Sequence, residues 1–142
     1  MGKSKVYTPQ VVVNGVVEGI GNTDRGLKHV IKRGQNARKG EEWVKLEPLD
    51  NGVKVIGSVD RKGRVVVITY NTRMVEVDIR TGENAGKRLP FVNVVKDVVD
   101  LGEWIGGEQA FDLERTLPGE TLAKVVLVQE GKGGPIVGIV RV

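Results

Sequence analysis

Short apolar runs separated by tight-turn dipeptides dominate this sequence, and they restrict the fold to one built mainly from antiparallel strands. Asn14-Gly15 and Asn51-Gly52 each lie between two such runs. Because Asn and Gly both tolerate a positive φ, this dipeptide is a strong hairpin signal. β-Branched side chains also fit the pleated surface of a strand better than a helix. We therefore expect a β-hairpin at both positions.

Beyond residue 41 the chain reads as β-structure almost throughout. Met74 to Ile79 alternates apolar and polar residues, which is typical of a strand with one face in water. Phe91 to Leu101 fits a helix by spacing, but its many valines favour a long or bulged strand. Roughly eight or nine strands are expected in all.

One helix is expected near the front of the chain, from about Thr23 to Arg33. Leu27, Val30 and Ile31 fall at helical spacing and would form its apolar face. Gly34 is expected to end the helix, because glycine is common just after the last helical residue.

These elements predict an α+β fold, a mostly antiparallel β-sandwich or partly open barrel with the helix beside the first hairpin. A chain of 142 residues is expected to form a single domain over residues 1–142. Within that domain, residues 1–40 would form the hairpin-plus-helix part and residues 41–142 the β-rich part.

The missing residue types exclude several chemistries. The chain has no cysteine, which excludes disulfides, thiol catalysis and thiolate metal sites. Its one histidine, His29, has no acid nearby in the sequence to make it a catalytic base. The sequence therefore predicts no cofactor and no metal site, and it assigns no catalytic residue.

Bases gather on the expected helix and just beyond it. The formal charge of +4 mildly favours anionic partners. One hypothesis is a nucleic-acid surface made of Arg25, Lys28, Lys32 and Arg33, continued by Arg38 and Lys39. Nucleic-acid binders usually add stacking aromatics, and only 4% of this chain is aromatic. A solvated helix face explains the same bases, so both interpretations stay open.

The stretch from Arg80 to Leu89 is the densest in polar groups between expected strands. It differs from a phosphate-binding loop, which has four residues between its glycines and Ser or Thr after its lysine. Here three residues separate Gly82 from Gly86, and arginine follows Lys87. Nucleotide binding by this stretch is therefore not favoured.

Two other uses of this stretch stay open. Glu83 with a second carboxylate would suit a small hydrolase. In the structural alternative, the glycines adopt positive φ while Glu83 and Asn84 bind loop amides, and Lys87 and Arg88 offset the acids.

Several groups of landmarks carry a family resemblance. Residues 7–15, Tyr-Thr-Pro-Gln-Val-Val-Val-Asn-Gly, resemble the proline-bearing strand and hairpin of thioredoxin-like proteins. The second half is similar to a bacterial family, the domain of unknown function 1223, in which a thioredoxin-like half precedes a β-rich half. The residues that carry this similarity are Arg80 to Leu89, Val92 to Lys96, Leu101 to Trp104, Val126 to Gln129 and Gly134 to Ile136.

The resemblance implies that residues 1–40 correspond to the last hairpin and helix of a thioredoxin fold. The cysteine-containing segment of the family has no counterpart here, so thiol redox activity is excluded for this chain. In thioredoxin-like folds the proline before this hairpin is cis, which implies a cis Thr8–Pro9 bond.

The resemblance also leaves the strand from Tyr7 to Val13 without its neighbour in a thioredoxin sheet. A bare valine-rich edge is an aggregation hazard and has to be covered. We expect a homodimer formed through this strand and through the helix that contains Leu27, Val30 and Ile31.

The leading functional hypothesis is a non-catalytic binding or interaction module for an unknown ligand or protein partner. Two alternative ligand sites are expected. One is a dimer cleft near Thr8 and Pro9, and the other is the loop that contains Glu83, Asn84, Lys87 and Arg88. No apolar run is long enough to span a bilayer, and the N-terminus lacks the apolar segment of a signal peptide. A cytoplasmic location without membrane contact is therefore expected.

Overall fold

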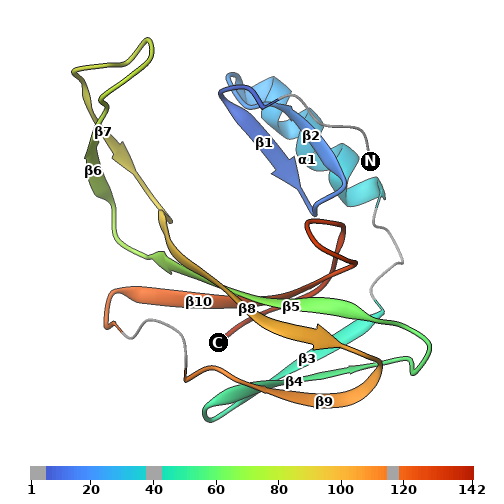
Figure 1. The fold of residues 1–142 in the computed structure, drawn as a ribbon. Coiled ribbons are helices and arrows are strands. Elements are labelled where there is room, and N and C mark those ends of the chain that lie inside the picture. The colour runs from blue at the N-terminus through green and yellow to red at the C-terminus, as the bar shows by residue number, and fades with distance from the viewer. Residues whose placement is uncertain (1–5, 38–42, 115–118) are drawn as a thin grey trace.

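The computed structural model describes residues 6–37, 43–114 and 119–142. These residues form eleven strands and one helix (Figure 1). In chain order the elements are β1 (Gln10–Val13), β2 (Val17–Ile20), α1 (Asp24–Ala37), β3 (Val44–Leu49), β4 (Gly52–Gly57), β5 (Gly63–Asn71), β6 (Val75–Asp78), β7 (Arg88–Phe91), β8 (Val95–Trp104), β9 (Gly107–Asp112), β10 (Leu122–Gln129) and β11 (Ile136–Arg141).

Two antiparallel sheets face each other across the main core. The larger sheet has the order β11-β10-β5-β8 and the smaller has the order β3-β4-β9. Their facing side chains form one buried cluster, which includes Trp104 and the valines at 53, 55, 65, 67, 126 and 128. The expected α+β sandwich is thus confirmed, and the described strands do not close into a barrel.

Strand β5 lies in the middle of the larger sheet, between β10 and β8. Successive side chains of a strand point to opposite faces. Val65, Val67 and Thr69 are buried and point toward the smaller sheet, so Val66 and Ile68 point away from it.

An N-terminal arm consists of β1, β2 and α1. Val30 of α1 packs over Gly19, and Gly34 packs against Val13. The approach is so close that a Cβ at either glycine would lie within 2.4 Å of the valine side chain. The prediction that Gly34 ends the helix is therefore wrong: α1 continues to Ala37. Gly34 is glycine because the helix approaches β1 closely there.

The N-terminal arm meets the sandwich at the turn between β1 and β2. The amide of Ile136 donates a hydrogen bond of 2.9 Å to the carbonyl of Asn14. Gly15 has φ +69, and a Cβ there would lie 2.5 Å from the carbonyl oxygen of Gly134. Both features depend on the Asn14-Gly15 hairpin, whose prediction is confirmed.

A second arm is the β6–β7 hairpin, which projects from the same side of the sandwich as the N-terminal arm (Figure 1). Among the described residues, β6 and β7 pair only with each other. The predicted glycine-rich stretch spans the tip of this hairpin, and its last two residues, Arg88 and Leu89, already belong to β7. This extra strand is one reason why the structure has more strands than expected.

Candidate interaction surface

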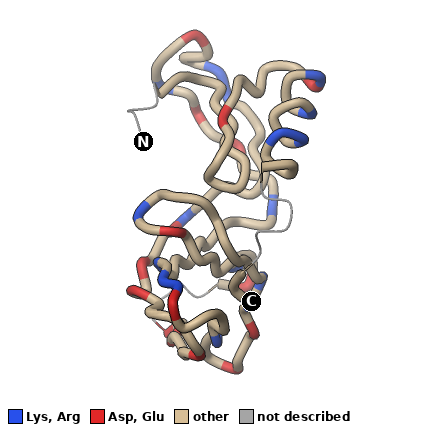
Figure 2. The backbone as a smooth tube through the Cα atoms, turned by 90° about the vertical axis from the view of Figure 1, so that its right-hand side faces the viewer, with Lys and Arg blue, Asp and Glu red and all other residues tan. Residues whose placement is uncertain are grey.

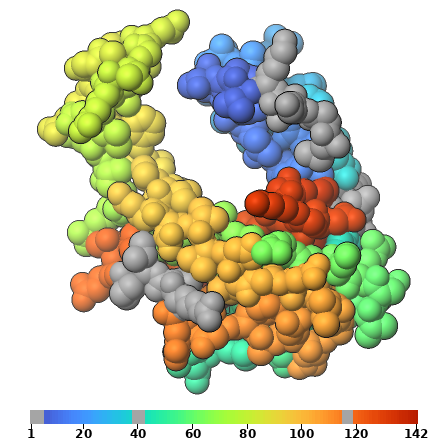
Figure 3. Space-filling model, in the orientation of Figure 1, coloured from blue at the N-terminus to red at the C-terminus, as the bar shows by residue number. Residues whose placement is uncertain are grey.

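A notch separates the two arms on one side of the sandwich. Figure 3 shows this hollow between the β6–β7 hairpin and the N-terminal arm, with β8 and the β10–β11 region beneath it. The arms project from the larger sheet, so the outer face of that sheet forms the floor of the notch (Figure 1).

The floor is apolar along three neighbouring strands. Ile68 of β5 lies opposite Val98 of β8 and Val125 of β10, so these three side chains share the outer face. Val98 is 59% exposed. Val66 and Tyr70 are half-buried and extend the same face by strand alternation, whereas Leu127 beside Val66 is buried.

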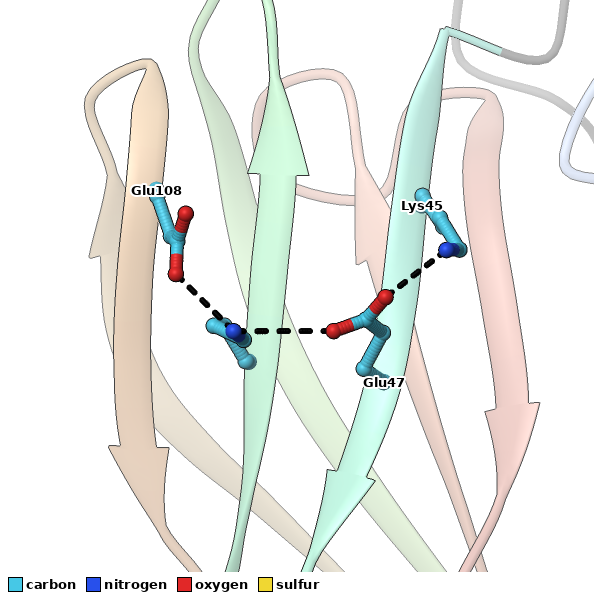
Figure 4. A network of polar contacts seen from close by, with 4 residues as sticks. Lys45, Glu47 and Glu108 are labelled. Atoms are coloured by element: carbon cyan, nitrogen blue, oxygen red, sulfur yellow. Dashed lines mark hydrogen bonds and ion pairs between the residues drawn. The ribbon is translucent and has the colours of Figure 1, made fainter.

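The outer face of the smaller sheet has the opposite character. Lys45 and Glu47 of β3, Lys54 of β4 and Glu108 of β9 alternate in charge across the strands (Figure 4). The three ion pairs measure 2.7 Å for Lys45–Glu47, 3.6 Å for Lys54–Glu47 and 2.9 Å for Lys54–Glu108. Hydrogen bonding to Lys45 holds the pKa of Glu47 below its ordinary value, and Glu108 raises the pKa of Lys54. The outer face of the smaller sheet is therefore hydrophilic.

One ion pair marks the polar end of the floor. Arg64 Nε lies 2.5 Å from Asp100 Oδ2, and the amide of Gly102 donates to Asp100 Oδ1 at 2.9 Å. These contacts, the hydrogen bond from Arg64 first, hold the pKa of the Asp100 carboxyl below its usual range. The charges of Arg64 and Asp100 neutralise each other. Arg64 is the only charged residue of β5, so the valine-rich part of the floor has no other charged neighbour on that strand.

The hairpin wall of the notch is amphipathic. Val75 pairs with Phe91 and Val77 with Leu89, which places four apolar side chains on one face. Phe91 is 41% exposed. On the other face Arg88 Nε contacts Asp78 at 2.9 Å and Glu76 at 3.8 Å.

The tip of this hairpin is held by its own hydrogen bonds. The amide of Gly86 donates to Ile79 at 2.8 Å, and the Lys87 ammonium donates to Asn84 Oδ1 at 3.0 Å. Gly82 and Gly86 have φ near +83 and +82. Glu83 is exposed at this tip. This geometry matches the structural alternative for the glycines, and the ion pairs of Arg88 match it as well. The Asn84 side chain accepts from Lys87 instead of from a loop amide.

The predicted ligand residues lie on two separate arms. Thr8 and Pro9 are exposed next to β1 and are joined by a cis peptide bond, whereas Glu83, Asn84, Lys87 and Arg88 belong to the hairpin arm (Figure 1). The two alternative sites expected from the sequence therefore lie on different arms, and each stays a prediction.

The bases of α1 lie on the outside of the N-terminal arm. Figure 2 shows Lys and Arg side by side along this helix. Arg25, Lys28, Lys32 and Arg33 are all exposed, and Val30 on the opposite face packs toward β2. Arg38 and Lys39 lie outside the described residues. Arg88 is on the other arm and is paired with acids there, so the helix bases and the hairpin bases do not form one patch (Figure 1).

The described parts of the chain contain no group of three or more His, Cys, Asp or Glu residues that could hold a metal ion. Helix α1 is neither long nor apolar enough to cross a membrane.

The floor was not predicted as a site, although a signal for it exists. Val65-Val66-Val67-Ile68 is a continuous apolar run in β5. Such a run is typical of a strand covered on both faces, whereas a strand with one wet face alternates. The sequence thus contained a sign that both faces of this strand need a partner.

Comparison with known proteins identifies the family. Residues 1–129 match DUF1223, a protein family of unknown function. The chain belongs to the DUF1223 family. No curated protein matches the sequence.

A crystal structure of a protein from Agrobacterium tumefaciens has the same fold as this DUF1223 chain. The two share 24% sequence identity with a TM-score of 0.65 over 99% of the present chain. The match covers 64% of the Agrobacterium protein, so the present chain spans less than two thirds of that relative.

Proposed function

We propose that this chain is a protein-binding module that holds its partner in the notch and performs no catalysis. The observation that carries the proposal is the contrast between the two outer faces of the sandwich. The outer face of the smaller sheet presents a ladder of ion pairs to solvent. The outer face of the larger sheet presents Val98, Ile68 and their apolar neighbours. An exposed apolar patch with a polar surround is typical of a protein-interaction site.

The shape of the molecule supports the same proposal. The two arms stand on either side of the apolar floor and give it depth (Figure 3). The hairpin arm adds Phe91 and Val77, both more than one-third exposed. A partner that enters the notch would cover the floor and this wall together, which favours a macromolecular surface over a small ligand.

The hydrolase alternative receives less support. A catalytic carboxylate usually lies in a cleft that excludes water and shifts its pKa. Glu83 instead lies at an exposed hairpin tip whose neighbouring polar groups bond one another. A Glu83→Gln variant that lost a hydrolytic activity of the wild type would revive this alternative.

The nucleic-acid alternative also receives less support. The bases of α1 form a stripe of their own, without the hairpin bases Lys87 and Arg88. Retention of the wild type on a polyanion column that falls steeply with salt would favour it again.

Two finer parts of the proposal rest on the sequence. We assign the N-terminal arm to the end of a thioredoxin-like fold, and the cis Thr8–Pro9 bond is compatible with that assignment. The single-domain organisation stays a proposal as well, and the expected boundary near residue 40 lies outside the described residues. A cytoplasmic location also remains a prediction, which fractionation of the native host cell would test.

Site-specific photocrosslinking tests the binding module. A benzophenone amino acid replaces Val98 on the floor in one variant and the exposed Val59 of the β4–β5 turn in a matched control. We expect a discrete protein adduct from position 98, in purified protein or in host extract, and none from position 59. Adding Val95→Asp, a second exposed substitution on β8, should suppress the adduct. Equal labelling from both positions, or none from position 98, would overturn the proposal.

A further inference from the structure

Among the described residues β1 pairs only with β2, and its outer edge differs from the other sheet edges in its lack of charge. Residues 6–13 contain no Lys, Arg, Asp or Glu. By contrast, the edge strand β8 carries Lys96, Asp97 and Asp100, and it is bulged at two points of its pairing with β5. Charges and bulges protect an exposed edge from pairing with another strand. The edge of β1 has neither protection within its four residues.

The geometry of the β1–β2 ladder shows which groups this edge offers. The amide of Gly21 donates to Pro9 at 3.2 Å, so Pro9 and every second residue after it direct their backbone polar groups toward β2. Gln10 and Val12 therefore direct their N–H and C=O groups to the open edge. Figure 1 shows β1 on the side of the N-terminal arm that faces the notch.

We propose that the partner in the notch is a second copy of this chain, whose β1 pairs antiparallel with β1 across a two-fold axis. This inference rests on the proposed function. Paired residues in an antiparallel ladder must both direct their polar groups across the gap. Of the registers that satisfy this rule, the one centred on Val11 uses all of β1. It sets Gln10 opposite the partner's Val12 and forms about four backbone hydrogen bonds.

Three physical features favour this arrangement. Pairing would join two two-stranded sheets into one of four strands and would give the N–H and C=O groups of Gln10 and Val12 hydrogen-bond partners. The strand carries no charge, so its symmetric pairing places no like charges opposite each other. Both copies of α1 would lie on the same face of the new sheet, because Val30 and Gly34 already pack on one face of β1 and β2. Val30 was expected to take part in the dimer interface, but it packs within its own arm.

The absence of cysteine from this chain allows a register-specific test. Gln10→Cys and Val12→Cys are prepared as separate proteins, mixed and mildly oxidised. We expect a disulfide-linked dimer with one chain of each kind, and at least tenfold less dimer from either protein alone. No dimer from the mixture, or equal dimer from Val12→Cys alone, overturns the proposed pairing. Val59→Cys, at an exposed valine far from β1 in the sequence, is the control and should not cross-link.

Sedimentation provides a second measurement that does not depend on oxidation. The wild type should sediment as a dimer at micromolar concentration. Val12→Pro removes an N–H that points to the open edge and leaves the bonds to β2 intact, so it should raise the dimer dissociation constant at least tenfold with an unchanged circular dichroism spectrum. A wild type that is monomeric throughout this range overturns the inference.

The tests separate this inference from the proposed function. A position-98 adduct with a different protein, together with no cysteine cross-link, shows that the chain is a binding module whose partner is not a second copy. No adduct and no cross-link together overturn both.

Discussion

The carbonyl oxygen of Asn14 accepts a hydrogen bond of 2.9 Å from the amide of Ile136, and this bond joins the N-terminal arm to the sandwich. The two residues are far apart in the sequence, and each lies at the end of a hairpin loop. Beside the bond, Gly15 lies against the Gly134 carbonyl. The position of one wall of the notch therefore depends on a small area of contact between two turns.

Gly15→Ala should loosen this joint. The new Cβ would lie 2.5 Å from the Gly134 oxygen, and φ +69 is unfavourable for alanine. Gly131→Ala is the matched control, because Gly131 has φ +68 and open space around it. The control should lose about 1–2 kcal/mol for the backbone conformation, and Gly15→Ala about 1–3 kcal/mol more. Urea unfolding gives both values, and faster hydrogen exchange at the Ile136 amide should occur only in Gly15→Ala.

Thr69→Val should stabilise the protein. The Thr69 hydroxyl is buried on the inner face of β5 and has no hydrogen-bond partner among the described residues, and Thr69 is 1% exposed. Replacing it by a methyl group removes an unsatisfied polar atom, which is worth about 1 kcal/mol.

Thr72→Val is the control for this substitution, because its hydroxyl donates to the Thr121 carbonyl at 3.0 Å. This variant should lose about 0.5–1.5 kcal/mol. Equal effects of the two substitutions on the thermal midpoint would contradict the assignment of Thr69 as unsatisfied.

Gly34→Ala tests a competition between helix propensity and packing. Alanine favours a helix interior by about 1 kcal/mol over glycine. A Cβ at position 34 would however lie 2.4 Å from Val13 Cγ1, and that valine cannot move without shifting β1. Overpacking of this kind costs about 1–3 kcal/mol, so we expect a net loss of stability.

A double-mutant cycle with Val13→Ala isolates the contact between positions 34 and 13. Because the smaller side chain makes room for the new methyl group, Gly34→Ala should destabilise less in the Val13→Ala background than in the wild type. The same cost in both backgrounds would contradict a direct clash.

The Arg64–Asp100 pair should make stability depend on pH at the acid end. The folded-state pKa of Asp100 is lowered, chiefly by the hydrogen bond from Arg64. The stabilisation is therefore fully present above the pKa of an unfolded aspartate, about 4. It is lost as the pH falls through the folded value. Both side chains are more than two-fifths exposed, so the effect is small and weakens in salt.

Asp100→Asn should abolish this part of the pH dependence. The urea midpoints of wild type and variant should converge as the pH is lowered below about 4 and separate above it. Midpoints that differ by the same amount at every pH would show that the ionised carboxyl is not responsible.

Local sequence patterns predicted the hairpins and the strands of the sandwich well, because turn dipeptides and alternation are local signals. The hairpins at Asn14-Gly15 and Asn51-Gly52 are clear cases. The end of α1 was missed because Gly34 has a tertiary role: it lies under Val13, and no local rule distinguishes such a glycine from a helix cap.

Local sequence patterns could not predict the order of the strands in the sheets or the presence of the notch. Strand β5 pairs with β8 and β10, which follow it at long range in the chain, and hydrophobic pattern alone does not choose among such partners. Glu83, Asn84, Lys87 and Arg88 were selected for chemical density, and Thr8 and Pro9 for a family resemblance, so the two groups lie on different arms. The floor between them consists of valine and isoleucine, which carry no chemical signature except an apolar run.

The self-neutralised Arg64–Asp100 pair at the end of an apolar floor has a kinetic consequence. Long-range attraction accelerates an encounter only when uncompensated charge surrounds the contact area. On this floor the nearest arginine already has its carboxylate at 2.5 Å. This pair would therefore add little to the electrostatic attraction of a partner toward the floor. The complex would dissociate as water re-enters between the valines. The rate of that step would determine how long the notch stays occupied.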